Sequence, residues 1–364
     1  MSDAALAWLR LARSRNVGPQ TFPRLIERFG SAERALEALP SLAAKGGERA
    51  YQPCSERQGR EEMARAEAAG AVMLRLFEED YPAPLAEIAD PPPFLWALGD
   101  VALAHRPAIA VIGARNASTL GRRMAGMLAE GLSAAGFVVV SGFARGIDAA
   151  AHAAAVEGAG TVAAMAGGAD VIYPEQNAAL AARMREGGGL FLSEAPMGMQ
   201  PLARHFPRRN RIVSGLSAAT VLIEAAVRSG SLITARMALE QGREVMAVPG
   251  SPLDPRAEGC NGLIRQGAAL IRSAEDVLEA LEGPRRLLSP ARDRPAPPAL
   301  PEPEPGGDLA ARLFELIGPS AVDLDALARD LGAAPSALAA ALLELELAGR
   351  VERLSGGMVA RAAE

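Results

Sequence analysis

The feature that most constrains the fold is segment 138–152, which reads Val-Val-Val-Ser-Gly-Phe-Ala-Arg-Gly-Ile-Asp-Ala-Ala-Ala-His. Its three valines predict a buried strand of a parallel sheet. Glycines then turn the chain into an alanine-rich helix, with Asp148 in the first turn, where the helix dipole favours a negative charge. Free N–H groups at such a turn form an anion pocket, to which Arg145 would add positive charge. The alternative is that the glycines only allow the chain to turn.

The same strand–loop–helix unit recurs from residue 107 onward. Alternating elements of this kind predict an α/β fold with a doubly wound, mostly parallel sheet, whose ligands bind beyond the carboxyl ends of the strands. The expected strands are 108–112, 137–140, 161–165, 190–193, 219–224, 244–248 and 269–271. The expected helices are 120–134, 147–157, 176–186, 208–214, 232–241 and a short one near 263.

The loops at those carboxyl ends are rich in glycine, and several carry Arg, Ser or Asn. Glycine in most of them suggests a surface that the backbone of a ligand approaches closely. These loops are 113–118, 141–146, 167–177, 193–211, 228–231 and 249–250.

The densest positive charge lies in segment 204–211, which holds four arginines and a histidine without any acid. Such a cluster usually marks a solvated face. Here it lies on the predicted ligand side and includes Phe206, and phosphate contacts beside a stackable ring are what single-stranded nucleic acid requires. Across residues 107–282, sixteen arginines balance sixteen acids, so only a local patch could attract a polyanion.

Composition excludes several chemistries. Lys45 is the only lysine, so the chain has no Gly-Lys-Ser/Thr phosphate loop and no Schiff-base lysine in the central domain. Cys54 and Cys260 form no CxxC motif, so neither a disulfide framework nor a metal site is indicated. No apolar run reaches the length of a membrane span, and the start of the chain lacks a signal-peptide pattern. We therefore expect a cytoplasmic protein without membrane contact.

Turns and composition divide the chain into five parts. Residues 1–75 are expected to be helical, with Gly30 closing a helix and Ser31 capping the next. A turn-rich connector spans 76–106, and the sheet domain spans 107–282. A linker over 283–307 is rich in proline and should be extended and semi-rigid.

The last part, 308–364, has the order of a winged helix, with three helices followed by a hairpin. The helix at the recognition position carries Glu344 and Glu346, and from Asp308 to the end nine acids face five arginines. Reading DNA bases requires donors and phosphate contacts. We therefore interpret the winged helix as a structural or protein-contact module.

Taken together, the ordered motifs of the central part closely resemble the DNA-processing protein A family (DprA, also called Smf). The motifs are Ile109-Ala-Val-Ile-Gly-Ala-Arg-Asn116, Ser141-Gly-Phe-Ala-Arg-Gly-Ile-Asp-Ala-Ala-Ala-His152, Ile172-Tyr-Pro-Glu-Gln-Asn177, Ser193-Glu-Ala-Pro196, Phe206-Pro-Arg-Arg-Asn-Arg-Ile212, Ser229-Gly-Ser-Leu-Ile-Thr234 and Val248-Pro-Gly250. The resemblance implies an extended Rossmann-like domain, a sterile-alpha-motif-like (SAM-like) N-terminal domain and a C-terminal winged-helix domain.

The resemblance also implies a function without catalysis. The family binds incoming single-stranded DNA in natural transformation, helps to load the RecA recombinase against single-strand-binding protein, and usually forms homodimers. No catalytic residue, metal or cofactor is expected. Glu175 stands where relatives often have lysine, so that cationic contact is not carried over. The candidate DNA-contacting residues are Gly113, Arg115, Ser141, Gly142, Arg145, Gly146, Asn177, Phe206, Arg209, Asn210, Arg211 and Ser231.

Three other functions stay open at this point. The fold also resembles nucleotide-binding phosphoribohydrolases, although their Pro-Gly-Gly-x-Gly-Thr loop is replaced here by segment 229–234, with Glu240 as the nearest following glutamate. A hydrolytic triad of Ser141, Asp148 and His152 lacks a nucleophile elbow, and an i,i+4 side-chain pair explains its last two members more simply. A sequence-specific regulator would require the acidic winged helix to read DNA.

Overall fold

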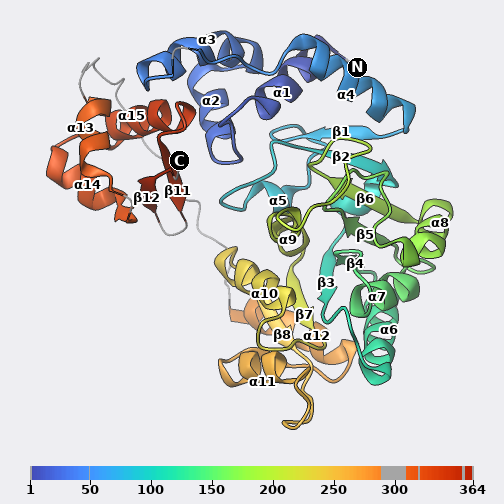
Figure 1. Cartoon of the computed structure of the whole chain (residues 1–364). Helices are drawn as coiled ribbons and strands as arrows, with labels where there is room; N and C mark the ends of the chain where they lie inside the picture. The colour runs from blue at the N-terminus through green and yellow to red at the C-terminus, as the bar shows by residue number, and fades with distance from the viewer. Residues whose placement is uncertain (1, 49, 288–308, 319, 355–356, 363–364) are drawn as a thin grey trace. The chain divides into compact units, whose positions relative to one another are not determined.

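The computed structural model describes residues 2–48, 50–287, 309–318, 320–354 and 357–362 (Figure 1). They form two compact units, of which unit 1 combines the described residues up to Met63 with those from Leu309 onward, and unit 2 spans Ala64 to Leu287. The boundary between the units falls inside helix α4. Most of the predicted linker lies outside the described residues, and its first residues continue α12 as far as Leu287 instead of being extended.

Unit 2 is built on a nine-stranded sheet in the order β1-β2-β6-β5-β4-β3-β7-β8-β9. The pairs from β6 to β9 are all parallel, which confirms the predicted doubly wound, mostly parallel α/β domain. The strands are β1 (Val72–Arg75), β2 (Phe94–Gly99), β3 (Ala108–Ile112), β4 (Val138–Ser141), β5 (Thr161–Ala164), β6 (Gly189–Ser193), β7 (Ala219–Leu222), β8 (Glu244–Ala247) and β9 (Ala269–Leu270).

The central strands are apolar on both sides because helices cover both faces of the sheet. Ile109 of β3 and Val139 of β4 share one core with Leu128 and Leu132. Full burial of each leucine contributes about 1.5–3 kcal/mol to the stability. The helices of unit 2 are α5 (Ala83–Ala86), η1 (Val101–His105), α6 (Thr119–Ala134), α7 (Ile147–Ala155), η2 (Glu175–Asn177), α8 (Ala178–Glu186), α9 (His205–Gly215), α10 (Gly230–Glu240), α11 (Glu258–Arg265) and α12 (Ala274–Leu287).

Two strands of the sheet, β1 and β2, fall where the sequence indicated helix and turn-rich connector. They form an antiparallel pair, and β2 also pairs antiparallel with β6. Trp96 in β2 is fully buried and faces Ser193 across the ladder. Prolines at 91–93 directly precede the short apolar run of β2 and indicate a turn instead of a strand. Its partner β6 lies about ninety residues away, so no local pattern predicts the pairing.

The order of the strands creates a switch point at β3. The chain places β4 on one side of β3 and, after β6, returns to place β7 on the other side. The crossover helices therefore leave β3 in opposite directions, which opens a crevice at the carboxyl ends of β3, β4 and β7.

Unit 1 contains the predicted N-terminal helices and the predicted winged helix. Gly30 ends α2 in the left-handed conformation (φ +76°), and the Ser31 side chain caps α3, both as expected. The winged helix has its own core around Leu342 and Leu345. The elements of unit 1 are α1 (Asp3–Arg13), α2 (Thr21–Phe29), α3 (Ala32–Lys45), α4 (Glu56–Ala68), α13 (Leu309–Leu316), β10 (Val322–Asp323), α14 (Leu324–Leu331), α15 (Pro335–Leu347), β11 (Val351–Leu354) and β12 (Met358–Arg361).

Within the described part of the chain, no single helix combines the length and hydropathy of a membrane span; α14 and α15 do so only when joined across a bend of 113°.

Candidate nucleic-acid interface

A cavity of about 860 Å³ lies at the switch point of unit 2. Its walls are the loops after β3, β4 and β7, together with the first turns of α9. The predicted residues Gly113, Arg115, Gly142, Phe206, Arg209, Asn210 and Ser231 all line it. Segments up to about 120 residues apart in sequence therefore meet in one place, as the sequence predicted for the carboxyl ends of parallel strands.

An aromatic and cationic column stands on one wall of the cavity. The guanidinium carbon of Arg115 lies 4.9 Å from the centroid of the Phe206 ring. The ring of Tyr173 lies 5.9 Å from that of Phe206, tilted by 52°, and remains 48% exposed. Tyr173 belongs to a motif that the sequence analysis identified, but it was not predicted as a site residue. Two neighbouring partly exposed rings offer stacking surfaces for flat ligands.

Three arginines at the rim keep their charge available. Arg115, Arg145 and Arg228 are exposed, and none has an ion pair among the residues that the structure describes. Arg145 does not line the cavity itself, but its loop touches the Arg115 loop. At Gly146 (φ +82°), a Cβ would lie 2.7 Å from the carbonyl oxygen of Arg115, so only glycine allows the two loops to approach so closely.

The helix N-termini at this edge differ in how their amides are used. At α7, the carboxylate of Asp148 accepts from the amides of Gly142 (3.1 Å) and Ala144 (3.2 Å). The predicted anion pocket of this loop is therefore already filled by the protein's own carboxylate. The Gly142 amide donates to Asp148 and its carbonyl accepts from Arg209, so phosphate binding by this backbone stays a prediction that the geometry does not support.

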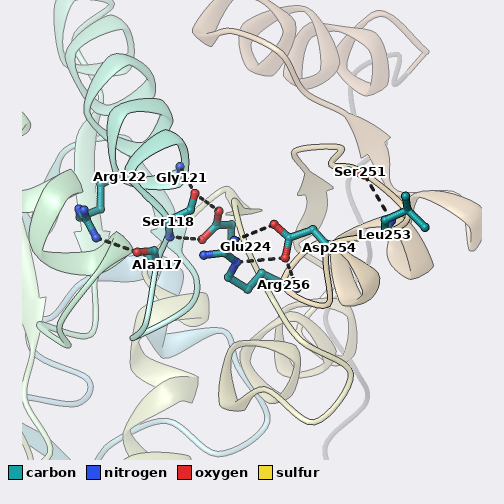
Figure 2. Close-up of polar contacts among 9 residues, drawn as sticks. All are labelled: Ala117, Ser118, Gly121, Arg122, Glu224, Ser251, Leu253, Asp254 and Arg256. Atoms are coloured by element: carbon teal, nitrogen blue, oxygen red, sulfur yellow. Dashed lines mark hydrogen bonds and ion pairs between the residues drawn. The ribbon is translucent and has the colours of Figure 1, made fainter.

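A second carboxylate occupies the N-terminus of α6 (Figure 2). Glu224, which follows β7, accepts from the Ser118 amide (2.9 Å) and the Ser118 hydroxyl (2.5 Å). A Cβ at Gly121 would lie within 2.7 Å of this carboxylate, so the glycine makes room for it. Arg256 lies beside Glu224 and pairs with Asp254 at 2.9 Å.

The N-terminus of α10 has no carboxylate in its first turn. Its cap is Ser229, whose hydroxyl lies 3.3 Å from the Ser231 amide and 2.7 Å from the Ser231 hydroxyl. Arg228 precedes the cap, and both serines line the cavity. Of the helix ends at α6, α7 and α10, this is the one that presents hydroxyls, positive dipole and an unpaired guanidinium to an incoming anion.

Two predicted residues support the loops and do not face the cavity. The hydroxyl of Ser141 is fully buried and donates to the Val111 carbonyl at 2.7 Å. Asn177 is buried and donates to the Phe143 carbonyl at 2.9 Å, which fastens the β4–α7 loop. Neither side chain lines the cavity, and direct DNA contact at these two positions stays a prediction that this geometry does not support.

The predicted arginine cluster divides into exposed and buried members. Arg204 and Arg208 are exposed, whereas Arg209 and Arg211 are buried. The Arg209 guanidinium reaches the cavity wall, but it donates to the carbonyls of Gly142 (2.6 Å) and Ala164. Burial lowers the pKa of Arg209 to about 10, which leaves it positively charged at neutral pH.

Arg211 does not line the cavity. Its guanidinium forms ion pairs with Glu194 (2.6 Å) and Asp90 (3.1 Å), and the side chain is 4% exposed. Burial opposes the charge, but Glu194 and Asp90 raise the pKa of Arg211 above its usual value. Two carboxylates of the fold therefore already compensate the charge of Arg211, and its contact with phosphate stays a prediction that this geometry does not support.

The hydrolytic triad is not formed. Thr161 donates its hydroxyl proton to the Val139 carbonyl, so His152 must donate from Nδ1 to the Thr161 oxygen at 2.7 Å. Burial, together with the charge of Arg209, lowers the pKa of His152 to about 3. His152 is a neutral core residue, and the expected pair with Asp148 is replaced by these separate partners.

Comparisons with known proteins agree with the fold. The family model of DNA recombination-mediator protein A matches residues 72–282. The DprA-like N-terminal HHH domain matches residues 2–65, and the DprA winged helix domain matches residues 294–357.

Similar proteins come from several bacteria. Protein Smf of Escherichia coli is 41% identical over 288 residues, 77% of this chain and 75% of that protein. DNA processing protein DprA of Bacillus subtilis is 44% identical over 58% of this chain and 72% of its own length. The X-ray structure of DprA from Streptococcus pneumoniae has 34% identity and a TM-score of 0.63, covering 77% of this chain and 98% of that one. A structure of DprA from Helicobacter pylori, described for its single-stranded DNA binding mode, has 29% identity and a TM-score of 0.53, covering 58% of this chain and 95% of that one.

Proposed function

This chain belongs to the DNA recombination-mediator protein A family, and on that premise we propose that its central domain binds single-stranded DNA during the processing of DNA in natural transformation. The observation that carries the proposal is the cavity of unit 2, where unpaired guanidiniums, a helix N-terminus without a carboxylate and two partly exposed rings converge. The Helicobacter pylori relative, which is described as binding single-stranded DNA, supports it.

Phosphates would bind at the rim. Arg115, Arg145 and Arg228 carry charges that the described part of the fold does not neutralise, and Ser229 and Ser231 add hydroxyl donors at the start of α10. Glu224 and Asp148 occupy the N-termini of α6 and α7, so a phosphate would be repelled there. The strand would therefore follow the line from Arg115 to Arg228. These contacts carry no base sequence, so the binding should be largely independent of sequence.

Bases would stack on Phe206 and Tyr173. The Arg115 guanidinium already lies over Phe206, which shows that the ring accepts a flat cationic partner on one face. A base–aromatic stack contributes about 1–3 kcal/mol, because each base has a π-face whatever its identity. Single-stranded DNA exposes its bases for such stacking, whereas duplex DNA does not.

Further steps of the proposal derive from family membership. They are loading of the RecA recombinase against single-strand-binding protein, homodimerisation and a cytoplasmic location. We propose that the protein acts by binding and not by catalysis. The described residues that line the cavity include no glutamate of the kind that a phosphoribohydrolase would require. Glu240 is the last residue of α10, about 15 Å along the helix axis from the N-terminal turn that lines the cavity.

A salt-dependent titration with single-stranded and duplex DNA of the same sequence tests the proposal. We expect tighter binding of the single strand and a steep linear fall of log affinity with log salt, from counterion release. Tyr173→Ala should weaken single-strand binding by about 1–3 kcal/mol without changing the salt slope, because stacking carries no charge. Equal affinity for both forms of DNA, or release of free base from nucleoside monophosphates, would contradict the proposal.

A further inference from the structure

The third helix of the winged helix, α15, is apolar on two faces. One face, with Leu338, Leu342 and Leu345, fills the core of the winged helix. The other face carries Leu343 and Leu347, which take no part in that core and yet are only 3% and 0% exposed. With Glu346, also buried, these two leucines form what we call the outer stripe of α15. In a DNA-reading winged helix, the stripe opposite the core faces the groove.

The N-terminal helices of unit 1 cover the outer stripe. Helix α15 packs against α3, and the side-chain amide of Asn16, between α1 and α2, donates to the Leu347 carbonyl at 2.9 Å. At Gly46, which follows α3, a Cβ would lie 2.2 Å from the Glu344 carbonyl oxygen and 2.6 Å from the Cβ of Ala348. Backbone therefore meets backbone at a glycine, as in a tightly packed interior.

Opposite charges also face each other across the contact. Glu346 lies between two guanidiniums, with Arg353 of the wing bonded to one carboxylate oxygen and Arg24 of α2 at 3.9 Å from the other. A carboxylate at the centre of an apolar helix face would be costly if it were left alone. Arg353 compensates its charge from within the winged helix, and Arg24 adds a second, more distant cation from the opposite side. Arg24 is the partner that the N-terminal helices supply.

We propose that the winged helix does not read DNA with α15 but uses the outer stripe of this helix to lock itself onto the N-terminal helices. The two domains then act as one body. The part of the winged helix that would enter a DNA groove is withheld from DNA, which agrees with its excess of acids over arginines.

Thiol reactivity in the full-length chain tests the contact between the outer stripe of α15 and the N-terminal helices. In a Cys54→Ser background, Leu343→Cys places a thiol on the outer stripe, and Ala339→Cys places one on the exposed part of the same helix. We expect the first thiol to react with a small maleimide at least about tenfold more slowly than the second, because it reacts only when the contact opens. Cys260 is fully buried in unit 2 and reports any general unfolding.

Gly46→Val should remove the protection of the thiol at position 343 from maleimide. The backbone of Gly46 is right-handed (φ −75°), a conformation that valine can adopt, and the atoms nearest to an added Cβ belong to Glu344 and Ala348 at the end of α15. Gly18→Val is the matched control, since a Cβ there meets no atom within 4 Å, and it should leave the protection unchanged. If Gly46→Val also exposes Cys260, the smaller Gly46→Ala takes its place. Equal reactivity of the thiols at 339 and 343, or protection that survives Gly46→Val with Cys260 still buried, would overturn the proposal.

Discussion

The exposed arginines at the rim of the cavity and the buried arginines of α9 use the same residue type for opposite purposes. At the rim, Arg115 and Arg228 are exposed and unpaired among the described residues. In α9, Arg209 donates to backbone carbonyls, and Arg211 is held by two carboxylates. The described fold leaves the charges at the rim without an ion pair, whereas it uses the two buried arginines to hold its own segments together.

The difference teaches that an arginine-rich motif does not define a surface. Segment 204–211 supplies both exposed and buried arginines within two helical turns, because successive residues of α9 point in different directions. An arginine near a binding site therefore indicates ligand binding only when the ion-pair and hydrogen-bond partners of its guanidinium are also known.

The largest effect should follow from removing Arg211. Arg211→Ala leaves Glu194 and Asp90 without their cation, so we expect a loss of about 3–5 kcal/mol in the free energy of unfolding. Urea denaturation of the two proteins measures it. The folded fraction of the variant should still bind single-stranded DNA normally, and a normal stability with weakened binding would place Arg211 at the rim.

Removing Arg115 should weaken DNA binding and leave the stability of the fold nearly unchanged, the opposite of the result expected for Arg211. We expect Arg115→Ala to weaken single-strand binding by about 1–3 kcal/mol, because a charge-assisted phosphate contact is lost. The melting temperature should change little, since Arg115 is exposed. Binding titrations with two unrelated sequences measure the loss, which should be equal for both. A loss confined to one sequence would show that Arg115 reads bases.

Acid should destabilise unit 2 through the buried side chain of His152. The unfolded chain takes up a proton near the ordinary pKa of 6.5, whereas the folded protein does so only near 3, so the unfolded state binds more protons between these values. Stability should therefore fall by about 1.4 kcal/mol through this group alone between pH 7.5 and 5.5. His152→Gln should remove that part of the decrease in urea denaturation, and His105→Gln, at an exposed position, should retain it. An unchanged pH profile in His152→Gln would show that His152 is not buried in its neutral form.

The smallest effect on the affinity for single-stranded DNA should come from deleting the C-terminal residues 288–364. Deleting residues 288–364 removes no residue of the cavity, so single-strand affinity should remain within about twofold, in the range of changes away from a site. The same salt-dependent titration measures it. Loss of binding would move the DNA contact from unit 2 to the winged helix.

Much of the fold follows from local sequence patterns. Buried valine and isoleucine runs followed by glycine loops predicted the parallel strands, and the helix caps at Gly30 and Ser31 were predicted from single residues. The strands β1 and β2 were missed because their pairing is non-local, and their sequence is interrupted by turn residues.

Several of the predicted site residues line one cavity, but the partners of their side chains were not predicted. The location of this cavity follows from topology, since parallel strands bring their carboxyl ends together. Which side chains remain available depends on partners distant in sequence, such as Asp90 for Arg211 and Phe143 for Asn177. The role of Tyr173 depends on its distance from Phe206, which only the folded chain sets.

The division of unit 1 between the two ends of the chain has a consequence for synthesis on the ribosome. The N-terminal helices emerge first, but α15 follows almost three hundred residues later, after all of unit 2. At translation rates of about 5–20 residues per second, the surface of α3 that receives α15 stays uncovered for roughly fifteen to sixty seconds. During that time the α15 segment of another chain made on the same messenger RNA could occupy this surface. Chaperone binding near Gly46 would therefore prevent association between nascent chains.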